Sequence, residues 1–262
     1  MAIMLALVNQ KGGVGKTTTC INMASYLAMR GQRVLLVDLD PQGNATSGLG
    51  IDKNAPGMTT YDMLINQVSI NNVQRETIQS NLYICPGTID LAGAEIEMVS
   101  MEQRESVLKR ALKDLEQPFD YILIDSPPSL GILTLNALTA CDGAIVPIQG
   151  EYYALEGVSQ LMDTISLVKA GLNPNLDIFG VVLTMYDSRT QLANQVNEEV
   201  RNYFGDKVFE TIIPRNVRLS EAPSYGQPIN IYDKRSKGGE AYHNLAREVM
   251  ARAGKEFVNG VA

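Results

Sequence analysis

Short runs of apolar residues recur along the chain, and between them apolar residues return every three or four positions. The first pattern predicts buried strands, and the second predicts helices with one buried face. The predicted strands cover residues 3–8, 33–37, 82–85, 121–125, 143–148, 178–185 and 208–213. The predicted helices cover residues 17–30, 60–66, 73–80, 101–115, 152–169, 191–204 and 241–257. This alternation predicts an α/β protein with a mostly parallel, twisted sheet and helices on both faces.

Two stretches follow neither pattern. Residues 41–48 are polar and rich in glycine, which predicts a surface loop, and their place after a strand favours a mobile loop that senses a ligand. Residues 214–236 contain three prolines and predict an irregular segment. No linker, repeat or low-complexity stretch divides the sequence. Residues 1–262 are therefore expected to form a single domain, with no helix-turn-helix domain before the first strand.

The loop between the first strand and the first helix carries the clearest chemical signal. It reads Q-K-G-G-V-G-K-T-T over residues 10–18. Glycines let successive N–H groups point into one concavity, and the helix that follows adds its positive dipole end. Lys16 supplies a full charge to phosphates, and the Thr17 hydroxyl is placed to bind Mg²⁺. A glycine loop that only turns the chain is disfavoured, because G-K-T follows a buried strand.

The same loop departs from the usual phosphate-binding pattern G-x-x-x-x-G-K-[S/T]. Gln10 stands where the pattern has its first glycine, and an additional lysine, Lys11, precedes Gly12. The sequence therefore predicts a phosphate-binding loop that carries a second cation.

Aspartates follow two of the predicted strands. Asp38 and Asp40 come at the end of the second strand, and Asp125 closes the apolar run 121–125. In a doubly wound sheet the carboxyl ends of the strands form the ligand-binding edge. A carboxylate there can hold Mg²⁺, usually through water. Asp125 could instead cap a turn, and spacing alone leaves open whether Asp38 or Asp40 handles the metal or the water.

Composition narrows the class of protein. There is no apolar run of about 18 residues, so no membrane-spanning helix is expected. The three cysteines are far apart and only one histidine is present, which argues against a zinc site or histidine-based catalysis. The net charge is −7, yet residues 189–262 carry a slight excess of basic residues. A surface for a polyanion is therefore expected to be local and to lie in the C-terminal third.

The motif K-G-G-x-G-K-T resembles the deviant Walker A motif shared by ParA/Soj partition ATPases, MinD and the nitrogenase iron protein. Further stretches resemble chromosomal ParA/Soj proteins in particular, and together with the loop they extend over almost the whole chain. They are residues 34–50, 91–97, 120–138, 151–161 and 211–224. The resemblance implies a single-domain P-loop NTPase that hydrolyses ATP with Mg²⁺.

The resemblance also implies roles for individual residues. Lys11, Lys16 and Asp40 would be catalytic, Lys11 at the partner subunit's nucleotide and Asp40 by orienting the attacking water. Thr17, Asp125 and Asp38 would serve the metal. The residues that would bind the nucleotide are Lys11, Gly12, Gly13, Val14, Gly15, Lys16, Thr17 and Thr18, with Pro214 and Asn216 at the adenine.

The resemblance implies a protein that segregates chromosomes or plasmids. It would be located in the cytoplasm, in association with the nucleoid. An ATP-dependent homodimer would bind double-stranded DNA without sequence preference and act with a ParB/Spo0J-like centromere-binding protein, whose basic N-terminal segment would stimulate slow intrinsic hydrolysis. The candidate DNA-binding residues are Arg189 and Arg218, with a looser match at Lys234, Arg235 and Lys237.

Two alternatives remain from the sequence. A MinD-like ATPase that cycles on membranes would use the helix at 241–257 as a basic amphipathic anchor, although packing of that face on the sheet is the preferred interpretation. A redox protein of the nitrogenase iron protein type would need cysteines such as Cys85 and Cys141 at a cluster, but neither lies in a stretch that resembles the cluster loops.

Overall fold

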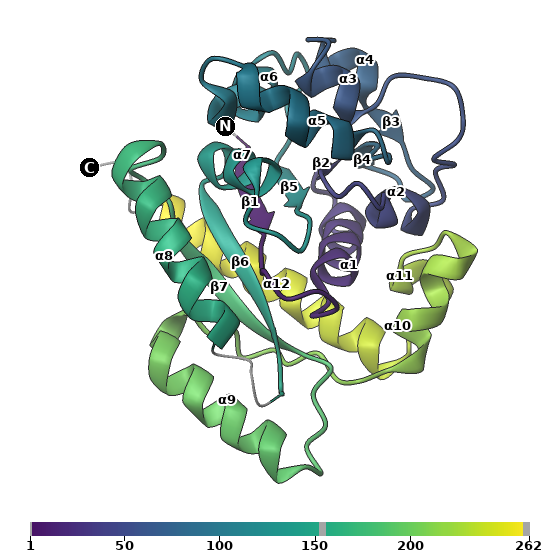
Figure 1. Ribbon diagram of the computed structural model, residues 1–262. Helices are drawn as coiled ribbons and strands as arrows, with labels where there is room; N and C mark the ends of the chain where they lie inside the picture. Colours follow the sequence, from purple (N-terminus) through teal and green to yellow (C-terminus); the bar gives the residue numbers. More distant parts are fainter. Residues whose placement is uncertain (1, 152–155, 259–262) are drawn as a thin grey trace.

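Seven strands form one sheet in the computed structural model, which describes residues 2–151 and 156–258 (Figure 1). The strand order is β3-β4-β2-β5-β1-β6-β7. All neighbours pair in parallel except β3 and β4, which are antiparallel. The strands are β1 (Ile3–Leu7), β2 (Val34–Asp38), β3 (Arg75–Glu76), β4 (Leu82–Cys85), β5 (Tyr121–Asp125), β6 (Gly143–Gln149) and β7 (Asp177–Thr184). The predicted α/β class is confirmed.

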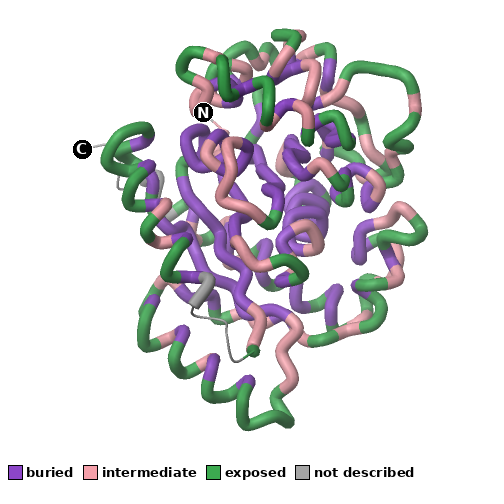
Figure 2. The backbone as a smooth tube through the Cα atoms, viewed as in Figure 1, coloured by how far each residue is buried: buried purple, intermediate pink, exposed green. Residues whose placement is uncertain are grey.

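Alternating residues of the central strands enter two separate hydrophobic cores. In β2, Leu35 and Val37 belong to one core, while Val34 and Leu36 belong to the other. Because side chains alternate across a strand, both faces of the sheet must be covered. Figure 2 shows the central strands as buried and the surrounding helices as partly exposed. The sheet therefore forms the rigid centre from which the loops at its carboxyl edge extend.

Helices cover both faces of the sheet. One layer contributes apolar residues to the same core as Leu35, and it consists of α3 (Thr60–Leu64), α4 (Ile70–Val73), α5 (Leu91–Glu97), α6 (Val107–Lys113), α7 (Ile132–Ala140), α8 (Glu156–Gly171) and α9 (Gln191–Phe204). The other layer consists of α1 (Lys16–Met29), α2 (Asn44–Gly48), α10 (Val217–Glu221), α11 (Ile229–Tyr232) and α12 (Lys237–Val258).

Helix α12 packs against α1 with its apolar face (Figure 1). Tyr242, Leu245 and Val249 are buried in the core, and the Tyr242 hydroxyl lies 3.0 Å from the hydroxyl of Thr19 on α1. As far as Ala253, the face considered for membrane binding is therefore occupied within the protein, as the preferred interpretation expected. Within residues 2–151 and 156–258, no helix has the length and apolar character needed to cross a membrane.

Two predicted elements are wrong. The predicted helix 73–80 is replaced by β3 and a turn that leads into β4, where the Thr77 hydroxyl donates to the Leu82 carbonyl oxygen at 3.0 Å and Asn81 adopts a φ of 67°. The polar hairpin satisfies its backbone through these local bonds. The predicted strand 208–213 is not formed: one isolated bridge pairs Val208 with Val181, and a second, just beyond the segment, pairs Pro214 with Tyr186.

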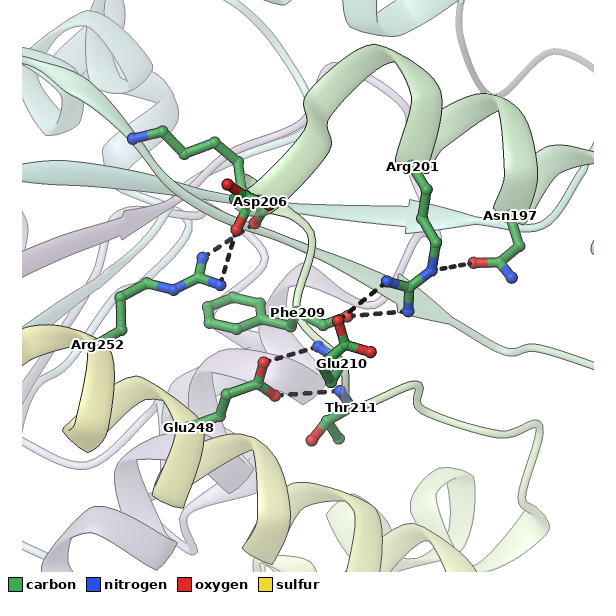
Figure 3. A network of polar contacts seen from close by, with 9 residues as sticks. Asn197, Arg201, Asp206, Phe209, Glu210, Thr211, Glu248 and Arg252 are labelled. Atoms are coloured by element: carbon green, nitrogen blue, oxygen red, sulfur yellow. Dashed lines mark hydrogen bonds and ion pairs between the residues drawn. The ribbon is translucent and has the colours of Figure 1, made fainter.

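Side chains of α12 hold the segment that was expected to be a strand (Figure 3). The Glu248 carboxylate accepts hydrogen bonds from the backbone N–H groups of Glu210 at 2.7 Å and Thr211 at 3.1 Å. The Arg252 guanidinium lies over the ring of Phe209, 4.3 Å from its centroid, and donates to backbone carbonyls in β7 and in the turn before Val208. The backbone N–H groups of Phe209 and Ile213 still donate to Val181 and Leu183 of β7, both at 2.8 Å, and Glu248 satisfies two of the N–H groups between them.

Other predictions differ at the boundaries. The loop 41–48 contains the short helix α2, and the irregular segment 214–236 contains α10 and α11. The helix predicted at 101–115 is shorter, since α6 begins at Val107. Helices α5 and α7 were not predicted. Residues 152–155 of the predicted helix 152–169 lie outside the described part of the chain.

We expect Gly180→Ala to destabilise the fold by about 1–3 kcal/mol, because overpacking a filled core is unfavourable. A Cβ at Gly180 would overlap the ring of Phe209 and crowd the Arg252 guanidinium. The matched control is Gly171→Ala, where no atom lies within 4 Å of the added Cβ. Urea unfolding of both variants measures the difference, and equal midpoints would contradict the tight packing at Gly180.

Candidate nucleotide-binding and catalytic site

The loop from Val8 to Gly15 connects β1 to α1 and is anchored from two neighbouring strands. The Asn9 side chain donates to the carbonyl oxygen of Pro147 in β6 at 2.8 Å, and the Thr184 hydroxyl of β7 donates to the carbonyl oxygen of Val14 at 2.8 Å. Gly13 and Gly15 have φ values of 75° and 87°, a conformation that glycine adopts without strain. The loop therefore presents its backbone in a fixed shape.

Lys16 begins α1 and is 6% exposed. Its ammonium donates to the Lys11 carbonyl oxygen at 3.2 Å. Burial lowers the pKa of Lys16, and the nearby carboxylates of Asp125 and Asp40 oppose that shift. A buried cation at a helix N-terminus is suited to binding phosphate groups.

Asp125 ends β5 and is fully buried, level with Asp38 on the adjacent strand β2. Within the described part of the chain, neither carboxylate oxygen of Asp125 has a hydrogen-bond partner. Burial, and then the proximity of Asp38, raise the pKa of the Asp125 carboxyl. The nearby Thr17 side chain opposes this rise in the pKa, although its position does not meet the geometry of a hydrogen bond to Asp125. Two buried, unpartnered oxygens beside a threonine hydroxyl fit a hard cation such as Mg²⁺.

Asp38 makes different contacts from Asp125. Its carboxylate accepts hydrogen bonds from the backbone N–H of Thr46 at 2.9 Å, from the Thr46 hydroxyl at 2.6 Å and from the backbone N–H of Asp40 at 3.1 Å. Burial raises the pKa of Asp38 to about 6, although the hydrogen bonds from Thr46 oppose the shift. Asp38 therefore holds the loop that carries Asp40 as well as lying beside the predicted metal site.

A cavity of about 370 Å³ brings most of the predicted phosphate-binding residues together. Asp40 lies at its edge, 7% exposed, with one carboxylate oxygen accepting from the backbone N–H of Gln42 at 2.9 Å. Four lining residues were not predicted, namely Gln42, Asn44, Pro128 and Met185. The complete lining is Gly12, Gly13, Gly15, Lys16, Thr17, Thr18, Asp40, Gln42, Asn44, Pro128 and Met185.

A second cavity of about 280 Å³ adjoins the first and shares Gly15, Thr18 and Met185 with it. Pro214 and Asn216, the predicted adenine residues, line it. Sequence reasoning missed Met185, which lies between the two cavities with a φ of 50°, an uncommon conformation for a residue other than glycine. Neither its type nor its spacing distinguishes it from a core methionine.

Lys11 lies outside the lining of both cavities. Its ammonium forms an ion pair with the Glu151 carboxylate at 2.8 Å, and the other oxygen of Glu151 accepts from the Gln149 side chain at 2.7 Å. The Lys11 side chain is 36% exposed. The additional lysine therefore extends away from the nucleotide site of its own chain.

The predicted DNA-binding residues are all exposed but lie on separate segments. Arg189 follows β7 and pairs with Asp187 at 2.6 Å, which holds the pKa of that carboxyl at about 2. Arg218 on α10 pairs with Glu221 at 2.9 Å and with Asp233 at 3.6 Å. The predicted residues Lys234, Arg235 and Lys237 follow Asp233 directly.

A third arginine, Arg215, was not among the predicted DNA-binding residues, and it lies between Arg189 and Arg218 in the sequence. It is exposed, it contributes to lowering the pKa of Asp187, and its backbone N–H donates to the Tyr186 carbonyl oxygen at 3.1 Å. The slight excess of basic residues in the C-terminal third was the one feature of the sequence that included it.

The three cysteines are free and buried. Burial raises the pKa of Cys20, Cys85 and Cys141. In residues 2–151 and 156–258, no group of three or more His, Cys, Asp or Glu side chains is arranged to hold a metal.

Comparison with known proteins agrees with this geometry. The model of the AAA_31 family, described as an AAA domain, matches residues 2–178. The sporulation initiation inhibitor protein Soj of Bacillus subtilis is 58% identical over 251 residues, covering 96% of this chain and 99% of that protein. The chromosome-partitioning ATPase Soj of Treponema pallidum is 53% identical over 255 residues, covering 97% and 100%.

A solved structure shows the same fold with a nucleotide. The crystal structure of cobyrinic acid a,c-diamide synthase from Mycobacterium smegmatis, with bound ADP and magnesium, has a TM-score of 0.83 and 40% sequence identity. The alignment covers 94% of this chain and 93% of that chain. The same protein has also been solved with an ATP analogue and magnesium.

Fold and site together define a P-loop ATPase of the ParA/MinD type, with ATP and Mg²⁺ as its cofactors. The near full-length relatives narrow this further. The chain belongs to the Soj/ParA family of chromosome-partitioning ATPases.

We expect Asp125→Asn to stabilise the nucleotide-free protein by about 1–3 kcal/mol at pH 8, because it replaces an unpartnered buried charge with a neutral group. Since the pKa of Asp125 is raised in the fold, the wild-type protein gains stability as the pH falls and the carboxyl takes up a proton. The advantage of the variant should therefore shrink toward pH 5. Thermal unfolding over this pH range measures it.

The same variant should lose Mg²⁺-dependent ATP hydrolysis. A variant less stable than the wild type at every pH would show that Lys16 needs the Asp125 charge more than the fold gains from its removal, and would contradict the prediction.

Proposed function

We propose that this ATPase forms a homodimer on binding ATP, and that the dimer binds double-stranded DNA without sequence preference. With a ParB-like partner it would segregate chromosomes or plasmids, in the cytoplasm and on the nucleoid. The observation that carries the proposal is the position of Lys11. Its ammonium lies outside the cavities of its own chain and is partly exposed, so it is available to the phosphates of a second subunit.

The residues of the site have distinct roles in this proposal. Lys16 and the backbone of residues 12–18 would hold the phosphates, Thr17 and Asp125 would hold Mg²⁺ with Asp38 in support, and Asp40 would orient the attacking water. Pro214 and Asn216 would lie against the adenine. Phosphoryl transfer depends mainly on positioning and charge neutralisation. Lys16 is the one cation that lines the described phosphate cavity, so intrinsic hydrolysis is expected to be slow.

Several observations favour partition over the alternatives. Chromosome-partitioning ATPases are among the relatives with more than 50% identity, whereas the diamide synthase is 40% identical. The apolar face of α12 is buried against α1, which removes the support for a membrane anchor. The cysteines are buried at separate places, which removes the support for a shared cluster.

The affinity for DNA should depend on Arg189 and on Asp187, the acid that pairs with it. Arg189→Ala should weaken ATP-dependent binding to a random-sequence duplex, because it removes a phosphate contact. Asp187→Asn should strengthen binding several-fold, because it releases the Arg189 guanidinium from its ion pair. Fluorescence anisotropy with ATP, with ADP and without nucleotide measures this. Tight binding in the ADP state, or Asp187→Asn binding more weakly than wild type, would count against the proposal.

Dimerisation should respond to the ion pair of Lys11. Glu151→Gln removes the charge that holds the Lys11 ammonium, so we expect a several-fold lower ATP concentration for dimer formation. Lys11→Ala should abolish the ATP-dependent dimer while leaving ADP binding intact. Analytical ultracentrifugation gives the oligomeric state. A Lys11→Ala protein that still dimerises on ATP would show that Lys11 acts within its own chain.

A further inference from the structure

Residues 40–43 form a tight turn at the edge of the phosphate cavity. The backbone N–H of Gly43 donates to the Asp40 carbonyl oxygen at 2.8 Å, and the backbone N–H of Gln42 donates to the Asp40 carboxylate at 2.9 Å. Aspartate, proline and glycine occupy the first, second and fourth positions, where the commonest β-turn prefers them. The sequence of the turn therefore favours its backbone shape, and the turn holds one oxygen of the Asp40 carboxylate.

Lys53 holds the turn from outside. Its ammonium donates to the Gln42 carbonyl oxygen at 2.8 Å. Gln42 is thus bonded through both of its backbone groups, the N–H to the Asp40 carboxylate and the carbonyl oxygen to Lys53. Hydrogen bonds from a charged donor are roughly twice as strong as those between neutral groups, so this contact restrains the backbone of Gln42.

The stem of Lys53 packs against the end of the same turn. A Cβ at Gly43 would lie 2.6 Å from the Lys53 Cδ and 2.5 Å from the Gly87 carbonyl oxygen. Gly43 has a φ of 57°, which glycine adopts without strain. Lys53 therefore contacts the turn twice, with its ammonium at Gln42 and with its stem at Gly43.

The backbone of Lys53 is itself held in place. The backbone N–H of Asn54 donates to the Asp52 carboxylate at 2.9 Å, which forms a local turn around Lys53. The backbone N–H of Ile51 donates to the Thr46 carbonyl oxygen in α2 at 3.2 Å. The ammonium of this exposed lysine is therefore presented to Gln42 from a segment that is attached to α2.

Lys53 lies beside the phosphate cavity without lining it. It lines a neighbouring cavity of about 460 Å³, and among the described residues Gln42 is the one that lines both cavities. The contact from the Lys53 ammonium to the site therefore runs through Gln42 to Asp40. Such an arrangement is suited to positioning a side chain and not to binding the phosphates.

We propose that Lys53 is a positioning residue for ATP hydrolysis, because it holds the turn that fixes the Asp40 carboxylate. The inference rests on the role of Asp40 in the function proposed above. Orienting a water molecule requires a carboxylate within a narrow range of positions. Nucleotide binding depends instead on Lys16 and the loop before it, so turnover and affinity should respond differently to changes at Lys53.

The test measures steady-state ATP turnover of Lys53→Met and Lys53→Arg. Methionine keeps an apolar stem against Gly43 and removes the donor, whereas arginine keeps a charged donor. Lys53→Met should lower kcat about tenfold and leave KM within about twofold, because an orienting group is displaced while the nucleotide site stays intact. Lys53→Arg should recover most of the kcat. The matched control is Lys207→Met, which removes an exposed ammonium that binds Asp177 at 2.9 Å.

The same assay on Asp40→Asn separates this inference from the proposed function. Asp40→Asn should lose kcat, and adding Lys53→Met to it should cause no further loss, because both changes act on one group. A further loss of similar size would show that Lys53 acts independently of Asp40, and would overturn the inference while the proposed function stands. Wild-type kcat in Asp40→Asn would contradict the proposed role of Asp40 itself.

Further measurements on Lys53→Met exclude other roles. Its midpoint of unfolding in urea and its sedimentation with ATP should match those of the wild type. A wild-type kcat would overturn the inference, and so would a loss of kcat that Lys53→Arg shares in full. A raised KM, a lower unfolding midpoint or the loss of an ATP-dependent dimer would assign Lys53 to nucleotide binding, to stability or to a subunit contact, and would overturn it as well.

Discussion

Two buried carboxylates at the same level of adjacent strands are the constraint on which the site depends. Asp38 and Asp125 end β2 and β5 in register, and both are fully buried. Charges so placed repel each other and are poorly solvated, so a fold that keeps them needs compensation. Asp38 is compensated from within the chain by Thr46 and the Asp40 backbone. Asp125 is compensated by no hydrogen bond in the described structure.

This asymmetry explains why the rest of the site is arranged as it is. Lys16 lies close to Asp125 and is itself buried, so each keeps the other from being an isolated charge. In the proposed function, Mg²⁺ would lie beside Asp125 and phosphates beside Lys16, which would satisfy both groups at once. Binding of the cofactors would then be coupled to the stability of the sheet edge. The same arrangement also positions the loop that carries Asp40, because the Asp38 carboxylate accepts hydrogen bonds from Thr46.

The sequence was sufficient where residue type and local order determine the geometry. Glycines, Lys16 and Thr17 after a buried strand can form little else, and the apolar runs of the parallel strands can only be buried. It failed where tertiary contacts decide. Segment 208–213 is apolar enough for a strand, but Glu248, about forty residues later, binds the backbone N–H groups of Glu210 and Thr211, and Arg252 binds the Lys207 carbonyl oxygen just before the segment. Met185 and Arg215 acquire their places from β7 and its neighbours, which no local pattern encodes.

The cations that the sequence assigned to intermolecular contacts share one property. Lys11 pairs with Glu151, Arg189 with Asp187, and Arg218 with Glu221, each at 2.9 Å or less. Ion pairs at exposed positions contribute about 0–1 kcal/mol, so each can be displaced by a phosphate at modest cost. In the isolated chain these acids reduce the attraction of the basic residues for stray polyanions. A ligand that engages several of these cations together gains more than one that engages a single cation, so the proposed dimer would bind DNA more tightly than a single chain would.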